Sequence, residues 1–311
     1  MQGHLRRRPR AASLLAVLAL AGCATPSAGP PQQAKGGAPA RMRADPQVEA
    51  QAAAFESFMR KAGAIDAGFS GPSAVSHALQ AGAGYEPKQL EAGMVAFAAV
   101  AALQDPAFVA AVRRQARDAK SGQALERQLA SRPDTALALP GADAAASRAR
   151  AALFRQGADL AEGGRKVKAA SYSLQRQAWA KAKVSDAPGR LNRVKAVAKA
   201  VYRPTGDDQA RLYSAVAQTG ARGGTASPVV ARGVALAALT AMGEGKAGAS
   251  LLAEPKSGMC VRVAKLNYHQ CLASAGPYYE DIYCLGQHAM IEPAQCVAAA
   301  AGAPPPARRR G

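Results

Sequence analysis

Apolar residues recur at the spacing of an amphipathic helix along most of the chain between residues 45 and 300. The alternation that is typical of half-buried strands is nearly absent. Several apolar segments begin where an acidic residue precedes proline, which favours a helix start because the carboxylate caps free amides and proline fits the first turn. Helices are predicted to begin at Asp45-Pro46, Gly71-Pro72, Glu86-Pro87 and Asp105-Pro106, and others to cover 123–131, 190–202, 207–218, 228–242 and 257–274. The pattern therefore predicts an all-α fold, a helical bundle.

The longest predicted helix covers residues 142–184, a stretch without proline. Large apolar residues recur every seven positions, and a small residue follows each of them four positions later. The large residues are Leu153, Leu160, Val167 and Leu174, and the small ones are Gly157, Gly164, Ser171 and Ala178. Such a seam lets a second helix approach closely. Each glycine costs roughly 1 kcal/mol of helix stability, so we expect tight packing to offset it, within this chain or against a second copy.

The first 22 residues have the features of a processed targeting signal. Four arginines precede a short apolar run, from Ala11 to Leu20, that is too short to cross a membrane as a stable helix. The run ends in Leu20-Ala21-Gly22-Cys23. This sequence resembles the lipobox of bacterial lipoproteins, in which a branched apolar residue and two small residues precede a cysteine. The resemblance implies a signal peptide over 1–22, cleavage before Cys23, and acylation of the Cys23 thiol and of the new N-terminus by chains such as palmitate.

The same resemblance predicts where the mature protein lies. Two or three acyl chains suffice for stable anchoring, whereas one is marginal. In that family an aspartate after the cysteine retains the protein in the inner membrane, and this chain has Ala24 there. We therefore expect a lipid anchor in the outer membrane, with the protein on the periplasmic side or at the cell surface.

Composition divides the mature chain into four parts. Residues 23–44, rich in Pro, Gly, Gln and Ala, predict a flexible tether. An all-helical domain is expected over 45–256 and a cysteine-rich helical hairpin over 257–300. Residues 301–311 predict a disordered basic tail.

Apart from Cys23, all cysteines lie within 37 residues, at Cys260, Cys271, Cys284 and Cys296. An even cluster in an exported chain is typical of disulfides. Cys260 and Cys271 would lie about 16 Å apart along a regular helix, beyond the roughly 7 Å between Cα atoms that a disulfide allows. Gly276-Pro277 breaks the chain before Cys284, so we expect an antiparallel hairpin. Nested pairs fit it: Cys271–Cys284 near the turn and Cys260–Cys296 at the open end.

The predicted hairpin is similar to the twin-cysteine helical hairpins of the mitochondrial intermembrane space. Ten and eleven residues separate the cysteines of its two arms, more than in that family, and Glu292-Pro293 interrupts the second arm. We interpret the likeness as convergence on one covalent staple, so it implies no shared function.

Two other interpretations of this segment stay open. A zinc site is the alternative to disulfides, since His269 and His288 lie close by in sequence, although no close pair of cysteines supports it. The segment also holds a tyrosine cluster that would suit a sugar or a peptide, or would cover a small core with its hydroxyls in water. The cluster consists of Tyr268, Tyr278, Tyr279 and Tyr283.

The chain has 40 Lys and Arg against 21 Asp and Glu, a formal charge of +19, and loss of the four signal-peptide arginines leaves +15. Residues 147–203 hold 14 basic and 3 acidic residues, a net of +11, whereas residues 44–134 hold 9 and 10. On the long helix we expect a basic strip opposite the apolar seam, formed by Arg148, Arg155, Arg165, Lys166, Arg176 and Lys183. The strip favours lipopolysaccharide, peptidoglycan, lipid phosphates or an acidic envelope protein as partner. A solvated face that serves solubility is the alternative.

No sequence motif specifies a reaction: the chain contains no GxSxG, Walker loop, HExxH, EF-hand loop or CxxCH. We therefore assign no catalytic residue, expect no cofactor, metal or nucleic acid, and favour a non-enzymatic protein. The enzymatic alternative is a cell-wall enzyme that uses Glu280 or Glu292 as its acid.

Together these features predict a structural or interaction component of the cell envelope that binds an anionic polymer or a partner protein. A secretion or assembly accessory factor is a further alternative, which differs only in its partner. The sequence leaves the oligomeric state open.

Overall fold

The computed structural model describes residues 42–218 and 220–303, and all of them belong to one compact unit. Within these residues every regular element is a helix, and the only strand-like pairing is a single bridge between Lys183 and Pro277. The predicted all-α fold is therefore confirmed. The predicted signal peptide, Cys23, nearly all of the tether and most of the C-terminal tail lie outside the described residues.

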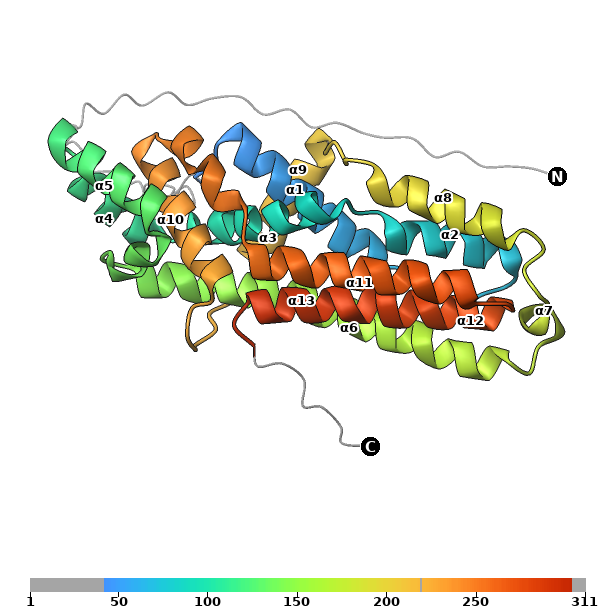
Figure 1. The fold of residues 1–311 in the computed structure, drawn as a ribbon. Coiled ribbons are helices and arrows are strands. Elements are labelled where there is room, and N and C mark those ends of the chain that lie inside the picture. The colour runs from blue at the N-terminus through green and yellow to red at the C-terminus, as the bar shows by residue number, and fades with distance from the viewer. Residues whose placement is uncertain (1–41, 219, 304–311) are drawn as a thin grey trace, which may run out of the picture. The chain divides into compact units, whose positions relative to one another are not determined.

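The first half of the chain forms α1 Pro46–Gly63, α2 Pro72–Ala83, α3 Pro87–Ala102, α4 Pro106–Gln115, α5 Ala119–Ser131, the 3-10 helix η1 Pro133–Ala138 and α6 Ala142–Leu174. The second half forms α7 Ala178–Lys181, α8 Ala187–Lys199, α9 Gly206–Ala217, α10 Pro228–Met242, the 3-10 helix η2 Gly245–Leu252, α11 Pro255–Ser274, α12 Tyr278–Cys284, the π-helix η3 Leu285–Ile291 and α13 Glu292–Ala300. Helices α6, α11 and the segment α12–α13 lie side by side, and the helices at the other end of the bundle, such as α5 and α10, cross them obliquely (Figure 1). For the five helices whose two ends were both predicted, apart from α6, each observed end lies within four residues of the predicted one.

The helix starts follow the predicted capping chemistry. The carboxylates of Asp45, Glu86 and Asp105 accept hydrogen bonds from backbone amides in the first turns of α1, α3 and α4, at 3.0, 2.8 and 2.9 Å. A proline follows each of these caps at the first helical position, where its missing N–H costs nothing. These local signals fix where α1, α3 and α4 begin.

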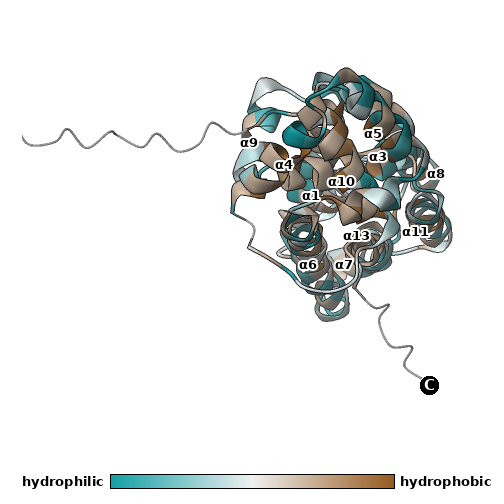
Figure 2. Cartoon of the chain, turned by 90° about the vertical axis from the view of Figure 1, so that its left-hand side faces the viewer, coloured by the Kyte–Doolittle hydropathy of each residue, from teal (hydrophilic) through white to brown (hydrophobic). Residues whose placement is uncertain are grey.

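Two apolar helices, α3 and α10, form the centre of the bundle. From Met94 to Ala102 no residue of α3 is more than 1% exposed, and residues 233–239 of α10 are likewise buried. Helix α3 packs against α1, α6, α10 and α11. The end-on view shows the apolar residues gathered between the helices and the hydrophilic ones on the outside (Figure 2). Burial of this apolar surface is the main driving force for the fold.

No single helix in the described part of the chain is long and apolar enough to cross a membrane; α3 and α4 pass such a test only as a pair, and they meet at 92°.

The C-terminal hairpin has the predicted antiparallel form, but the expected interruption of its second arm at Glu292-Pro293 is wrong: η3 runs directly into α13, and the backbone of Ile291 and Glu292 is helical. Helix α11 is one arm, and α12, η3 and α13 form the other, which runs back antiparallel beside it (Figure 1). The predicted nested disulfides are confirmed: Cys260 is bonded to Cys296 and Cys271 to Cys284, with Cα atoms 5.7 and 5.6 Å apart. The pairs hold both ends of the hairpin together.

The small-residue seam of α6 packs against the second arm of this hairpin. A Cβ on Gly157 would lie 3.0 Å from the Ala294 carbonyl oxygen in α13, and one on Gly164 would lie 2.9 Å from Met290 Cβ in η3. On the facing helix, a Cβ on Gly286 would lie only 2.6 Å from the backbone nitrogen of Lys168. The expected close approach therefore occurs, and the partner helix belongs to the same chain.

Helix α6 is shorter than predicted. It ends at Leu174, so the prediction of helix is wrong for most of residues 175–184, where only the short α7 is helical. The chain turns because Trp179 packs beside Tyr278, with ring centroids 6.4 Å apart. The Val184 amide also donates to the Gly276 carbonyl oxygen at 2.9 Å. Contacts with the hairpin turn, distant in sequence, end the helix where no proline marks its end.

Buried charged side chains cap helix ends that belong to their neighbours. Lys265 of α11 donates to the carbonyl oxygens of Ala83 and Tyr85, at 2.7 and 2.9 Å, at the end of α2. Glu91 of α3 accepts from the Glu254 amide at the start of α11, at 2.8 Å. Terminal amides and carbonyls that lack partners within their own helix are satisfied in this way. Part of the charge of this chain is therefore structural.

Replacement of Gly164 by valine should lower the free energy of unfolding by about 2–3 kcal/mol, because the added atoms would overpack the interface with η3. Equilibrium unfolding in urea measures the loss. The matched control is Gly122→Ala in α5, where a Cβ would meet no atom closer than 3.4 Å. We expect that control to be neutral or to gain up to about 1 kcal/mol from helix propensity. Equal losses in both variants would contradict a special close approach of α6 to the hairpin.

Candidate binding site

A pocket of about 260 Å³ lies where the end of α6 meets the turn of the cysteine hairpin. It is lined by Ser171, Tyr172 and Gln175 of α6 and its C-cap, by Cys271, Ser274 and Ala275 at the end of α11, and by Tyr279, Glu280, Tyr283 and Cys284 of α12. The lining is mainly apolar, and three of its side chains are tyrosines. We call it the tyrosine pocket.

Aromatic rings and one lysine shape the mouth of the tyrosine pocket. Tyr172 is 55% exposed, and its ring stands nearly perpendicular to that of Tyr283, with centroids 6.2 Å apart. The Lys168 ammonium lies 5.0 Å from the centroid of the Tyr283 ring and donates to the Gln287 side chain at 2.8 Å. Exposed ring faces beside a cation can take an apolar or sugar surface together with a negative charge.

The hairpin turn beneath this pocket is held from two sides. The disulfide Cys271–Cys284 joins the two arms there. On the other side, Arg190 of α8 reaches in and donates to the Asp281 carboxylate and to the Leu272 carbonyl oxygen. Arg190 and Asp281 are 4% and 0% exposed. Because this pair is covered and caps the end of α11, it supports the pocket rather than contacting a ligand.

The structure changes the geometry of the predicted basic strip. Arg148 is half-buried and lies 3.5 Å from Asp105, while Arg165 and Lys166 both pair with Glu162. Arg155 is exposed on α6. The prediction that Arg176 and Lys183 continue the strip along the helix is wrong, because α6 ends at Leu174, before both residues.

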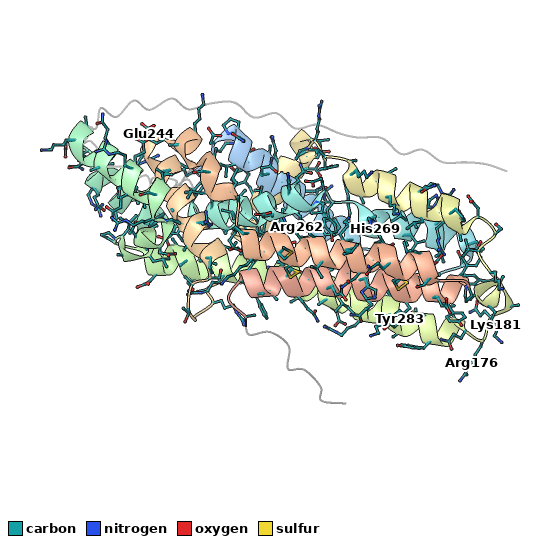
Figure 3. All side chains as sticks on the ribbon, viewed as in Figure 1. Arg176, Lys181, Glu244, Arg262, His269 and Tyr283 are labelled. Atoms are coloured by element: carbon teal, nitrogen blue, oxygen red, sulfur yellow. A yellow bond between two sulfur atoms is a disulfide. The ribbon has the colours of Figure 1, made fainter. Side chains whose placement is uncertain are left out.

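Instead, three exposed cations gather near the tyrosine pocket: Arg176, Lys181 and Lys183. Arg176 and Lys181 lie at the same end of the bundle as Tyr283 (Figure 3). The backbone of Lys183 forms an isolated antiparallel β-bridge with Pro277 at the hairpin turn. Within residues 42–218 and 220–303, these three side chains take part in no ion pair. They remain available to an anionic ligand.

The two carboxylates considered as catalytic acids have structural partners. Glu280 accepts a hydrogen bond from the Gly276 amide at 2.8 Å in the hairpin turn. Burial acts to raise the pKa of Glu292, but hydrogen bonds with His288 and Asn267 outweigh it and hold the pKa below its usual value. A general acid needs a raised pKa to hold its proton near neutral pH. The arrangement therefore favours a structural role for both.

The alternative of a zinc site finds no support in the described residues. The four cysteine sulfurs are joined in pairs, and no three His, Cys, Asp or Glu residues of this part of the chain lie close enough to share a metal ion. Tyr268, the fourth member of the predicted tyrosine cluster, is 1% exposed and donates to the Leu79 carbonyl oxygen at 3.0 Å. It belongs to the core and not to the pocket.

Several residues of the site could not be recognised from the sequence alone. Tyr172 and Lys168 stand on the predicted helix, but nothing in the sequence brings them to the hairpin turn. Nothing in the sequence distinguishes Arg190 from the other basic residues of the segment 147–203. The one usable signal was the predicted tyrosine cluster, of which Tyr279 and Tyr283 line the pocket; whether they bind a ligand stays a prediction.

Comparisons with protein families, with curated proteins and with solved structures find no match to this chain. No ligand or activity is therefore carried over from a relative, and the ligand class has to follow from the residues around the pocket.

His269, on α11, gives a test of the hairpin in solution. Burial, and then the nearby Lys265, Lys195 and Lys199, lower the pKa of His269 to about 4. An unfolded histidine has a pKa of about 6.5, so below that pH the unfolded chain binds a proton that the folded protein does not. The stability due to neutral His269 is complete above pH 6.5 and is lost as the pH falls toward 4.

Replacement His269→Gln should therefore flatten the fall in unfolding free energy between pH 6.5 and pH 4, as measured by urea unfolding at a series of pH values. His77→Gln, at an exposed position of α2, is the matched control. The same slope in the wild type and in His269→Gln would contradict the buried neutral histidine.

Proposed function

We propose that the protein is a non-enzymatic, lipid-anchored component of the bacterial cell envelope that binds an anionic glycan at the tyrosine pocket. The lipobox Leu20-Ala21-Gly22-Cys23 supports the anchor, with Cys23 as the acylated residue and the outer membrane as the expected location. The disulfides of the hairpin are in keeping with an oxidising compartment such as the periplasm.

One observation carries the binding proposal: exposed Tyr172 and half-buried Tyr279 and Tyr283 line a pocket at the same end of the bundle as Arg176, Lys181 and Lys183 (Figure 3). Within the described residues these three cations form no ion pair, and the one carboxylate in the pocket lining, that of Glu280, accepts from the Gly276 amide. Tyrosine rings pack against the apolar faces of sugar rings, and their hydroxyls bond to sugar hydroxyls. Guanidinium and ammonium groups pair with carboxylate or phosphate oxygens. A ligand that offers both surfaces is a sugar polymer that carries acidic groups, such as peptidoglycan or lipopolysaccharide.

The pocket favours this ligand over the other partners of the basic strip. A strip that attracts any anion needs only charge and no cavity. An acidic protein would need a broader complementary surface than a pocket of about 260 Å³ offers. An assembly or secretion factor with a protein partner is the remaining alternative. No described residue favours the cell-wall enzyme, because both candidate acids, Glu280 and Glu292, are engaged in structural hydrogen bonds.

Replacement Cys23→Ser should move the protein from the membrane fraction to the soluble fraction, because no thiol is left at that position to carry the lipid. Immunoblotting of salt-washed membranes measures the distribution, and mass spectrometry of the unsubstituted protein should find acyl chains on Cys23. The matched control is Cys23→Ser in a protein that carries an unrelated transmembrane anchor, which should stay in the membrane fraction. If the Cys23→Ser protein stays in the membrane fraction after the salt wash, the anchor proposal is wrong.

The double replacement Arg176→Gln and Lys183→Gln should weaken binding to peptidoglycan or to lipopolysaccharide about fivefold or more, since two charge-assisted contacts are lost. Tyr172→Ala should weaken it by a similar factor through loss of ring contact. Sedimentation with purified sacculi and titration with lipopolysaccharide measure the affinity. Binding should weaken as salt is raised for the wild type, and less steeply for the double variant.

Arg155→Gln is the matched charge control. Arg155 is exposed on the same helix, 17 positions before Tyr172, which places it roughly 25 Å away along α6. An equal loss in Arg155→Gln would show that diffuse charge, and not the tyrosine pocket, drives the attraction. If the affinity for the glycan changes neither with salt nor with these replacements, Arg176 and Lys183 belong to a solvated surface and do not bind the ligand.

A further inference from the structure

A second and larger cleft, of about 480 Å³, opens between α1, the end of α2 and the chain that follows α8. It shares no lining residue with the tyrosine pocket. Its volume is within the range of roughly 300–1,000 Å³ that is typical of small-molecule sites. We call it the α1–α8 cleft.

One part of the α1–α8 cleft is apolar. Ala54 and Phe58 of α1 face Val197 of α8 and Val201 across it. Val201 is 65% exposed, the highest value among the large apolar side chains that are exposed in the described residues. An apolar side chain left in water at the mouth of an apolar cleft indicates a surface that a ligand covers.

The other part of the cleft is polar and positive. Ser57 and Lys61 stand one turn apart on the same face of α1, and Arg203 lies across from them. The Lys61 ammonium donates to the Tyr202 hydroxyl at 2.9 Å, and Arg203 is exposed and takes part in no ion pair within the described residues. Lys61 and Arg203 therefore both line the cleft, and no carboxylate is among its lining residues, although Asp208 lies behind Tyr202 and near enough to Lys61 for the two charges to interact.

Ser57 supplies an independent sign of a missing ligand. The residue is only 1% exposed, and its hydroxyl has no hydrogen-bond partner in the part of the chain that the structure describes. A buried hydroxyl that bonds to nothing destabilises a fold, so such groups are rare and call for an explanation. A ligand oxygen that reaches the floor of the cleft would satisfy it.

The wall formed by the chain after α8 is held in place without a ligand. The side-chain amide of Gln89 both donates to the Tyr202 carbonyl oxygen, at 2.7 Å, and accepts from the Tyr202 amide, at 2.8 Å. The Tyr202 hydroxyl donates to Asp208 at 2.7 Å. Because this segment is fixed at Tyr202, the cleft is preformed, which lowers the cost of binding.

We propose that the α1–α8 cleft binds a single-chain amphiphile with an anionic head group. The acyl chain would cover Ala54, Phe58 and Val201, and the head-group oxygens would accept hydrogen bonds from Ser57, Lys61 and Arg203. A plain hydrocarbon would leave the Ser57 hydroxyl and the Arg203 guanidinium without a partner, and a polar glycan would leave the apolar wall exposed. A free fatty acid and a lysophospholipid share the required chemistry.

Isothermal titration of the full chain carrying Cys23→Ser, with oleate and separately with oleoyl-lysophosphatidylglycerol, tests this proposal. Both ligands stay below their micelle concentrations. We expect saturable binding of one molecule per chain, and the tighter of the two identifies the source of the head group. Oleyl alcohol, which has the same chain without the charge, should bind at least about tenfold more weakly than oleate, as expected if charge-assisted hydrogen bonds are lost.

Variants locate the site. Lys61→Gln and Arg203→Gln should each weaken oleate binding about fivefold, and Val201→Asp should weaken it further by placing a charged side chain against the acyl chain. Ser57→Ala should weaken binding and also raise the melting temperature of the free protein, because it removes an unsatisfied buried hydroxyl. Controls are Lys120→Gln, an exposed lysine of α5, and Ser214→Ala, whose hydroxyl bonds to its own helix in α9.

Tyr172→Ala should leave oleate binding unchanged, so failure of this proposal and failure of the glycan proposal can be told apart. Absence of saturable binding by both amphiphiles would overturn the inference. So would binding of oleyl alcohol as tight as that of oleate, or oleate binding that Lys61→Gln and Ser57→Ala leave at the level of their controls.

Discussion

The close approach of α6 to the second arm of the cysteine hairpin is the contact on which the rest of the structure depends. It is possible only because Gly157, Gly164 and Gly286 put no side chain between the two backbones. Since α6 also packs on α3 and α1, this approach joins the hairpin to the central apolar helices. It also sets the distance between Tyr172 and Tyr283, so the mouth of the tyrosine pocket is a consequence of glycine packing several turns away.

The charge of the chain has two uses that composition cannot separate. Lys265 and Arg190 are buried, and each donates to carbonyl oxygens at the end of a neighbouring helix; Arg190 also pairs with the Asp281 carboxylate. Burial lowers the pKa of Lys265 to about 7. Exposed cations such as Arg176 and Lys183 have no such partners. The excess of basic residues indicates an anionic partner only after the structural ones are set aside.

The tyrosine pocket and the α1–α8 cleft lie on separate elements and differ in chemistry. The first offers open aromatic faces beside cations, which suits a polymer that stays largely in solvent. The second offers an apolar wall and a buried hydroxyl, which suits a ligand that leaves solvent. A protein held at a membrane by its own lipid would meet both kinds of ligand, sugar polymers on one side and amphiphiles on the other. The two proposals are compatible and independent of each other.

The sequence by itself determined the fold class, most helix starts and the disulfide pairing, because caps, helical periodicity and the reach of a disulfide are local properties. It also identified the seam of α6 from Leu153 to Leu174. Tertiary structure alone decided that this seam packs on the hairpin and that α6 ends at Leu174, because those outcomes depend on contacts between residues about a hundred positions apart. For the same reason only the fold could bring Tyr172 to Tyr283, and Ser57 to Arg203.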